Sequence, residues 1–256
     1  MSNGIVYVNV GRRDNSILEA SLQIVRFYQP EIPITIYSDV DLPFLDNTHK
    51  IELKHFDRVK YNDREENRNS SLWRLKALRE SKYDNTCYLD NDIFLTHPGF
   101  FEGLRIAEHY GICMVENPRY FISTMLPMQL NIQENLGDMD IGVDVQPHDR
   151  EFTKDMPKYM TALNMGVMFY SKKSEDFLDE LIWEQENNPS RGQAGLYRTI
   201  WKTKQYPYML PLSWLVCKKH VGIQHPLALH VGHEEVMKWW QEQFKDRIYK
   251  NEPGYR

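Results

Sequence analysis

Two aspartates, Asp90 and Asp92, stand two residues apart between short apolar runs in the segment 86–95, Thr-Cys-Tyr-Leu-Asp-Asn-Asp-Ile-Phe-Leu. Carboxylates are costly beside apolar strand segments unless a positive group meets them. Side chains alternate along an extended chain, so residues i and i+2 point to the same side and the two carboxylates can act together. Hard oxygen ligands suit Mn²⁺ or Mg²⁺, and Mg²⁺ is usually held by one or two carboxylates plus substrate phosphates. The pair therefore predicts a divalent-cation site that handles a diphosphate.

The spacing alone does not single out this pair, because Asp39 and Asp41, and also Asp138 and Asp140, share it. The last two follow a glycine inside a long polar segment at about 116–160, which is rich in Asn, Asp, Gln, Pro and Met. Length without clear periodicity predicts a functional insertion or lid there, and solvated carboxylates are the usual expectation for such a run. The elements that flank each pair must therefore decide between them.

Strand and helix patterns alternate along the chain. Apolar runs predict strands at 5–10, 34–37, 50–53, 87–89, 163–170, 208–212 and 227–230, and helical spacing predicts helices near 16–29, 71–79, 177–188, 196–201 and 237–244. Ser70 or Ser71 is the predicted N-cap of the second helix. Such alternation predicts an α/β fold with a mostly parallel central sheet and helices on both faces, in which ligands bind beyond the carboxyl ends of the strands. Asn9, Asp39 and Asp90 all fall at such ends.

With 41% hydrophobic and 26% charged residues, the chain has a globular composition and is long enough for one large domain or two small ones, and we favour one domain over residues 1–256. The formal net charge of −5 with well-mixed signs argues against a nucleic-acid partner. No apolar stretch approaches 18 residues, so we expect a cytoplasmic protein without a transmembrane segment and leave peripheral membrane association open. Cys87, Cys113 and Cys217 sit in apolar contexts, which predicts core positions without chemistry. Nothing here indicates an oligomeric state.

The segment 88–93, Tyr-Leu-Asp-Asn-Asp-Ile, resembles the Tyr-Leu-Asp-x-Asp core of GT-A fold glycosyltransferases. The order of other segments resembles glycosyltransferase family 8, the retaining galactosyl- and glucosyltransferases. Upstream, the segment 71–76 is similar to one in which an Arg contacts the nucleotide diphosphate or sugar, a position taken here by Arg74. Downstream, the segment 163–168 is similar to a strand whose Asn and Gly line the sugar and acceptor cleft, which implies this role for Asn164 and Gly166.

The C-terminal third carries the rest of the resemblance. Gly192 and Gln193 stand where the family often has Asp-Gln. His230, followed by Val and Gly, is similar to the histidine that completes the family's metal site, and Lys238 to the lysine that approaches the diphosphate. His230 also closes an apolar strand, where this type of fold places ligand groups. His233 remains the alternative metal ligand.

The resemblance implies a glycosyltransferase that uses Mn²⁺ (or Mg²⁺) and a nucleotide-diphosphate sugar, with a UDP-sugar favoured, and a glycan, lipid-linked glycan or other hydroxyl acceptor. Asp92 and His230 would be direct ligands, and Asp90 would ligate the metal or bridge it to ribose. Retention needs no strong nucleophile, and Gln193 would then stabilise the oxocarbenium-like state. Inversion would need a carboxylate base near the acceptor hydroxyl, for which Asp138, Asp140 and Asp144 are candidates.

Three polar residues are candidates for contacts with the nucleoside. Asn9 and Asp39 end the first two predicted strands, where nucleobase and ribose would bind, and Asn91 lies between the two aspartates. For Asp39 a simple turn is an equal alternative, because Asp and Pro favour turns for local reasons.

Two other functions compete with glycosyl transfer. A sugar nucleotidyltransferase would require a glycine-rich phosphate loop after the first strand, whereas Gly11 is the single glycine there. A non-catalytic carbohydrate- or nucleotide-binding protein of the same fold would be favoured by loss of the acidic pair, and both aspartates are present.

Overall fold

The computed structural model describes residues 1–10, 15–45, 51–58, 65–121, 161–187, 193–217, 223–232, 234–243, 245 and 246. Its strands are β1 (Asn3–Asn9), β2 (Ile34–Ser38), β3 (Ile51–His55), β4 (Asn85–Leu89), β5 (Ile93–Leu95), β6 (Ile112–Phe121), β7 (Thr161–Ser171), β8 (Tyr208–Leu210) and β9 (Ala228–His230). Its α-helices are α1 (Ser16–Tyr28), α2 (Glu65–Arg79), α3 (Glu102–Tyr110), α6 (Glu175–Asn187), α7 (Gln193–Thr203) and α8 (Glu234–Gln243). The 3-10 helices are η2 (Pro98–Phe101), η3 (Lys172–Ser174) and η4 (Leu212–Trp214).

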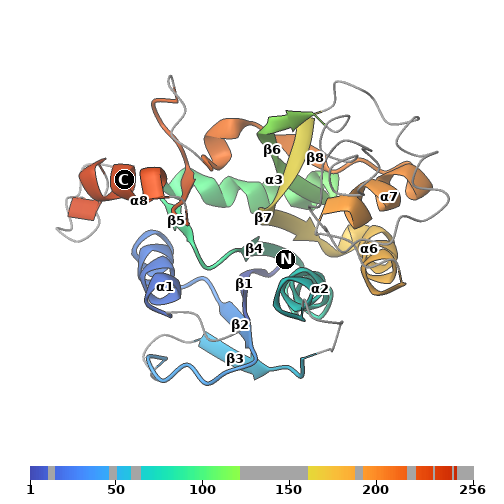
Figure 1. Ribbon diagram of the computed structural model, residues 1–256, viewed down its shortest axis with the longest axis horizontal. Helices are drawn as coiled ribbons and strands as arrows, with labels where there is room; N and C mark the ends of the chain where they lie inside the picture. Colours follow the sequence, from blue (N-terminus) through green and yellow to red (C-terminus); the bar gives the residue numbers. More distant parts are fainter. Residues whose placement is uncertain are drawn as a thin grey trace, which may run out of the picture.

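Seven strands form one sheet in the order β3-β2-β1-β4-β7-β6-β8, and β5 pairs with β9 in a separate antiparallel ribbon (Figure 1). The pairs β2–β3, β1–β2, β1–β4 and β6–β8 are parallel. Strand β7 runs antiparallel to both of its neighbours, β4 and β6. The prediction of an α/β fold with a mostly parallel sheet is therefore confirmed.

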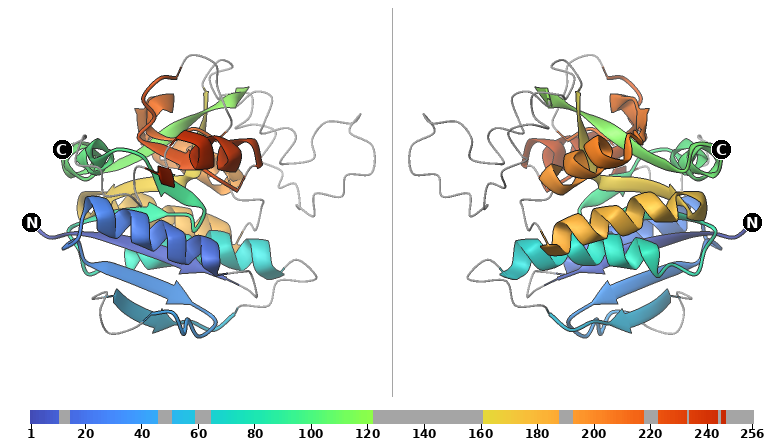
Figure 2. Two further views of the ribbon diagram at one scale, coloured as in Figure 1. Left: turned by 90° about the vertical axis from the view of Figure 1, so that its left-hand side faces the viewer. Right: turned by 90° about the vertical axis from the view of Figure 1, so that its right-hand side faces the viewer.

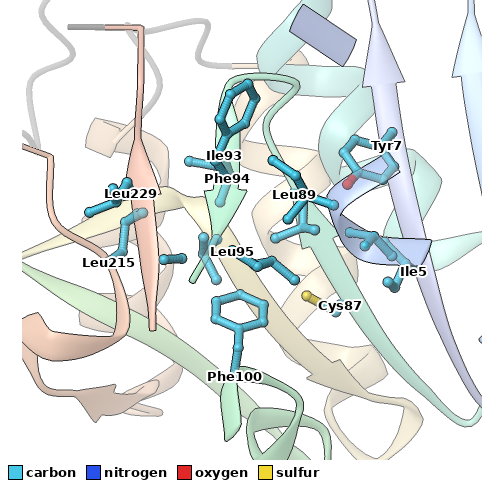
Figure 3. Close-up of a cluster of buried hydrophobic side chains, with 14 of the residues drawn as sticks. Ile5, Tyr7, Cys87, Leu89, Ile93, Phe94, Leu95, Phe100, Leu215 and Leu229 are labelled. Carbon is cyan, nitrogen blue, oxygen red and sulfur yellow. The ribbon is translucent and has the colours of Figure 1, made fainter. Parts of the chain in front are cut away.

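Helices cover both faces of the sheet (Figure 2). Along β1, Ile5 and Tyr7 pack into the cluster that also contains buried residues of α1, α3 and α8, whereas Val6 and Val8 pack with α2, α6 and α7. Figure 3 shows the first cluster, in which β1 and β4 meet the β5–β9 ribbon. Burial on both faces explains why these strands are continuous apolar runs. None of the described helices is long and apolar enough to span a bilayer.

The strand order changes direction at β1. From β1 the chain moves to β2 and β3 on one side, and later places β4 on the other side. Such a switch point opens a crevice at the carboxyl ends of the strands. Strand β7 starts at this same edge, because it is antiparallel and its Val167 lies opposite Leu89, the last residue of β4. Residues that follow β1, β2 and β4 can therefore meet residues in the first half of β7.

Two predicted segments differ from the structure by more than a few residues at a boundary. Helix α2 begins at Glu65, so the predicted cap at Ser70 or Ser71 is wrong and both serines lie inside the helix. The first turn of α2 has no apolar residue, so hydrophobic spacing could not indicate it. Of the predicted insertion, residues 116–121 belong to β6, and 122–160 lie outside the described residues.

Candidate functional site

The acidic pair lies in a turn that follows β4. The backbone N–H of Ile93 donates to the carbonyl oxygen of Asp90 at 3.1 Å, and β5 begins directly after Asp92. The extended conformation predicted from side-chain alternation is therefore wrong here, because this hydrogen bond closes a turn. The two carboxylates converge nevertheless, since one ligand atom from each of Asp90, Asp92 and His230 lies within 4.8 Å of the others.

Asp90 is held by two side chains. Its Oδ1 accepts a hydrogen bond from the Tyr88 hydroxyl at 2.5 Å and pairs with Arg74 Nη2 at 3.1 Å. Arg74 Nη1 also donates to the carbonyl oxygen of Met165 in β7 at 3.0 Å, and its side chain is 14% exposed. Arg74 is thus no exposed helix residue. Burial lowers the pKa of Arg74, but Asp90, Tyr88 and Asp92 together outweigh this effect, so the net shift of that pKa is upward.

Asp92 is held by the histidine that the sequence favours. His230 Nε2 lies 3.1 Å from Asp92 Oδ2, and the Val231 N–H donates to the carbonyl oxygen of Asp92 at 2.8 Å. The β5–β9 ribbon produces this contact, because it pairs His230 with Ile93, the residue after Asp92. Burial lowers the pKa of His230, but hydrogen bonds to Asp92 and Cys217 and the negative charges of Asp92 and Asp90 together outweigh it and raise that pKa to about 10. In the metal-free protein the imidazole is therefore protonated at neutral pH.

Two glycines allow the carboxylates to approach the backbone. A Cβ on Gly166 would lie 2.8 Å from Asp90 Oδ2, and one on Gly232 would overlap Asp92 Oδ2. The carbonyl oxygen of Gly166 also accepts from the Asp90 N–H at 2.8 Å. A side chain at either position would therefore displace a carboxylate.

Buried amides connect the acidic turn to the end of β1. Asn91 Nδ2 donates to Asn9 Oδ1 at 2.8 Å, and Asn9 Nδ2 lies 3.3 Å from both Ser38 Oγ and Asn15 Oδ1. Asn9 is only 2% exposed. The structure thus brings Asn9 and Asn91 together, so the predicted nucleoside edge is continuous with the acidic pair.

Asp39 follows β2 at the same edge. Its side chain is 3% exposed and forms an ion pair with Arg58, which follows β3. Its backbone N–H donates to the carbonyl oxygen of Asn9 at 3.4 Å. The Asp39 carboxylate is therefore buried and ion-paired, and its contact with the nucleoside stays a prediction.

The convergence of Asp90, Asp92 and His230 fits a divalent cation. All three are partly buried, and they offer carboxylate oxygens and an imidazole nitrogen, a donor set that Mn²⁺ accepts. Both carboxylates already have a cationic partner, Arg74 or His230. A cation bound here would take the place of the proton on the imidazole, because a histidine ligand must be neutral.

Three contributors to this site are not among the predicted residues. Tyr88 and Gly232 lie within the motifs that the sequence singles out, so their neighbourhood was indicated but not their contacts. Cys217 was predicted to be a core residue like Cys87 and Cys113; those two are buried, whereas Cys217 is partly buried and packs against the core cluster. Its Sγ also accepts a hydrogen bond from Asn164 Nδ2. No local pattern indicates that contact, because it joins segments far apart in the sequence.

Other predicted residues are not placed against the acidic pair. Gln193 is the first residue of α7, but its side chain falls outside the description, and Lys238 is an exposed residue of α8. His233 and the aspartates at 138, 140 and 144 lie outside the described residues. The roles suggested for them stay predictions.

Comparisons with known proteins agree with this architecture. No family model matches the sequence, and no curated protein matches it. The structure is similar to the galactosyltransferase LgtC in complex with donor and acceptor sugar analogues, with a TM-score of 0.61 and 12% identity over 96% of this chain and 95% of that one. It is also similar to apo mouse xyloside xylosyltransferase 1, with a TM-score of 0.53 and 10% identity over 92% and 99% of the two chains.

A third similar structure is the apo form of the bifunctional glycosyltransferase WbbM, with a TM-score of 0.56 and 13% identity over 99% of this chain. The chain spans 52% of the length of WbbM. Together with the strand order, these likenesses show that the chain has the GT-A glycosyltransferase fold, as the resemblance predicted. At such low identities they show the fold alone, so membership of family 8 stays a prediction.

The close approach at Gly232 predicts the effect of adding one methyl group. Gly232→Ala should displace the Asp92 carboxylate and weaken Mn²⁺ binding about tenfold or more, because a Cβ would overlap Asp92 Oδ2. Titration followed by the electron paramagnetic resonance of free Mn²⁺ measures the affinity. The control is Gly103→Ala, whose added methyl group would meet the Phe169 ring in the core. This variant should be less stable than the wild type but should retain its Mn²⁺ affinity. Equal affinity in the Gly232→Ala variant and the wild type would contradict the geometry.

The ion pair at Asp90 predicts an energetic coupling. Arg74→Met should lower the free energy of unfolding by about 3 kcal/mol, because it leaves a partly buried carboxylate without its cation. Adding Asp90→Asn to that variant should recover part of the loss, whereas Asp90→Asn alone should destabilise the protein. Urea unfolding of the four proteins gives the coupling free energy. A coupling near zero would show that Asp90 does not depend on Arg74.

Proposed function

We propose that this protein is a metal-dependent glycosyltransferase that moves a sugar from a nucleotide-diphosphate sugar, with a UDP-sugar favoured, to a hydroxyl of a glycan or lipid-linked glycan, with retention of configuration. The observation that carries the proposal is the convergence of Asp90, Asp92 and His230 within 4.8 Å at the carboxyl edge of a GT-A sheet. The glycosyltransferases with similar structures support the reaction class.

Asp92 and His230 are the proposed direct ligands of Mn²⁺ (or Mg²⁺), and Asp90 the third ligand or a bridge to the ribose. When bound, the cation would act as a Lewis acid and neutralise the departing diphosphate. The chain prepares the site by holding both carboxylates in place, Asp90 through Tyr88 and Arg74 and Asp92 through His230. No large rearrangement of these side chains is then needed on binding.

Charge at the site supports a diphosphate as the ligand. In the metal-free protein two carboxylates are balanced by the Arg74 guanidinium and the His230 imidazolium. Exchange of the imidazole proton for a divalent cation would leave these four groups and the cation together with one net positive charge, which attracts an anionic ligand. Asn9, Asn91 and Asp39 continue the same edge and would contact the nucleobase and ribose.

For the transfer itself we propose the retaining route. The bond from the anomeric carbon to the phosphate oxygen breaks, the acceptor oxygen attacks from the same face, and its proton passes to the departing phosphate. Gln193, at the start of α7, would stabilise the positive charge on the sugar through its amide oxygen. Asn164 and Gly166 in β7 would lie on the acceptor side, and Lys238 would contact the diphosphate.

The direct test is Asp92→Asn. This variant should lose Mn²⁺-dependent release of UDP from the donor by at least about a hundredfold, because one proposed ligand is weakened, while its thermal unfolding still shows a folded protein. Asp41→Asn changes an exposed aspartate of a second Asp-x-Asp spacing and should retain activity. A panel of UDP-sugars, assayed for free UDP, provides the measurement. Undiminished turnover in Asp92→Asn would refute the site.

The same assay separates the alternatives. A sugar nucleotidyltransferase would release pyrophosphate from a nucleoside triphosphate and a sugar 1-phosphate. A non-catalytic protein would bind a nucleoside diphosphate and turn over neither substrate.

The raised pKa of His230 predicts how Mn²⁺ binding depends on pH. A cation that displaces one proton from a group of pKa about 10 binds about tenfold more tightly for each unit rise in pH below that value. Calorimetric titration between pH 6 and 8 should show this slope in the wild type. His230→Gln should bind Mn²⁺ more weakly and with little dependence on pH over the same range. A flat wild-type profile would show that Mn²⁺ displaces no proton from His230, which would contradict the combination of a raised pKa and a role as ligand.

A further inference from the structure

The backbone of Ile93, the residue after Asp92, turns its polar groups away from its partner strand. Strand β5 pairs with β9 outside the main sheet, and Ile93 stands opposite His230 in that ribbon. The His230 N–H donates to the carbonyl oxygen of Val216 at 3.0 Å, and the Ile93 N–H closes the acidic turn on the carbonyl oxygen of Asp90. The carbonyl oxygen of Ile93, which is fully buried, therefore requires a partner from another element.

Helix α1 supplies this partner. Ser21 Oγ donates to the carbonyl oxygen of Ile93 at 2.7 Å, and the Ser21 side chain is fully buried. The Tyr7 hydroxyl in β1 lies 3.0 Å from the same Ser21 oxygen.

The chemistry of these groups fixes the direction of each hydrogen bond. A serine hydroxyl has one hydrogen and a carbonyl oxygen can only accept, so the Ser21 hydrogen goes to Ile93. The Tyr7 hydroxyl must then donate to Ser21 Oγ. A buried, directed chain thus runs from β1 through α1 to the first residue of β5.

The two preceding residues of the acidic turn are held by other elements. Asn91 Nδ2 donates to Asn9 Oδ1 at the end of β1, and the carbonyl oxygen of Asp92 accepts from the Val231 N–H after β9, both at 2.8 Å. The bond from α1 to Ile93 completes this set. The turn is therefore fastened on three sides, and each fastening reaches a different part of the chain.

We propose that Ser21 is a positioning residue that holds the acidic turn in place from the side of α1. It bonds to the backbone of the turn rather than to a carboxylate, so it acts through the position of Asp92 and not as a ligand. Without the hydroxyl, the buried carbonyl oxygen of Ile93 would lose this bond, and the turn would open more often. The effect on a bound cation rests on the proposed function, whereas the effect on the turn does not.

The first measurement is hydrogen exchange of the Ile93 amide in the metal-free protein, followed by NMR. In Ser21→Ala this amide should exchange at least about tenfold faster relative to the amides of β4, because the turn opens locally while the sheet stays closed. The ratio to β4 separates this opening from a general loss of stability.

A matched control makes the same substitution elsewhere in the core. Ser81→Ala removes a buried hydroxyl that contacts Thr86 Oγ1 at 2.7 Å, at the other end of β4 from Asp90. It should leave the exchange ratio unchanged. An unchanged ratio in Ser21→Ala as well would overturn the proposal, whether or not metal binds.

The second measurement is Mn²⁺ affinity, followed by electron paramagnetic resonance. Ser21→Ala should bind Mn²⁺ about tenfold more weakly than the wild type, since groups that position metal ligands typically have effects of this size. Tyr7→Phe also removes a hydroxyl from the buried chain but leaves the bond from Ser21 to Ile93, so its affinity should lie within about threefold of the wild type.

The two measurements together separate the possible outcomes. Equal weakening in Tyr7→Phe and Ser21→Ala would overturn the proposal, because the effect would then come from the core and not from the Ile93 carbonyl. Wild-type Mn²⁺ affinity in Ser21→Ala would also overturn it. Faster Ile93 exchange in Ser21→Ala, with no Mn²⁺ binding by any of the proteins, would support the positioning of the turn and refute the metal-dependent function.

Discussion

Two carboxylates at the end of a buried strand require positive charge close by, and the local architecture follows from this requirement. Asp90 and Asp92 come directly after a strand that is buried on both faces, where an unpaired charge is costly. Arg74 from α2 and His230 from β9 supply the two cations. The metal-free site is thus electrically balanced, and this balance favours exchange of one proton for a divalent cation.

The topology explains how the partners come from such distant parts of the chain. The parallel strands β1, β2 and β4 bring Asn9, Asp39 and Asp90 to one edge, and the antiparallel β7 starts its course at that edge. The β5–β9 ribbon then brings the C-terminal histidine alongside the acidic turn. Because Gly166 and Gly232 have no side chain, the carboxylates can lie directly against these two segments.

Features that depend on short stretches of the chain, such as apolar runs and helical spacing, could be predicted from the sequence. The apolar runs of β1, β2 and β4 and the helical spacing of α1 were readable because each element buries its own side chains, and the strand end marked the acidic pair. The turn at Asp90 and the contact between Asn164 and Cys217 could not be predicted in this way. The turn closes through a local hydrogen bond from Ile93 to Asp90 that the apolar flanks do not indicate, and Asn164 and Cys217 are 53 positions apart, so no short pattern encodes their contact.

The central claim is that the acidic site binds a cation and a nucleoside diphosphate together. Thermal unfolding in the presence of Mn²⁺, UDP or both tests it most directly, because a ligand that binds only the native state raises the melting temperature. We expect a clear rise in the melting temperature with UDP and Mn²⁺ together and little rise with UDP alone. No rise with any nucleoside diphosphate at millimolar concentration in the presence of Mn²⁺ would contradict it.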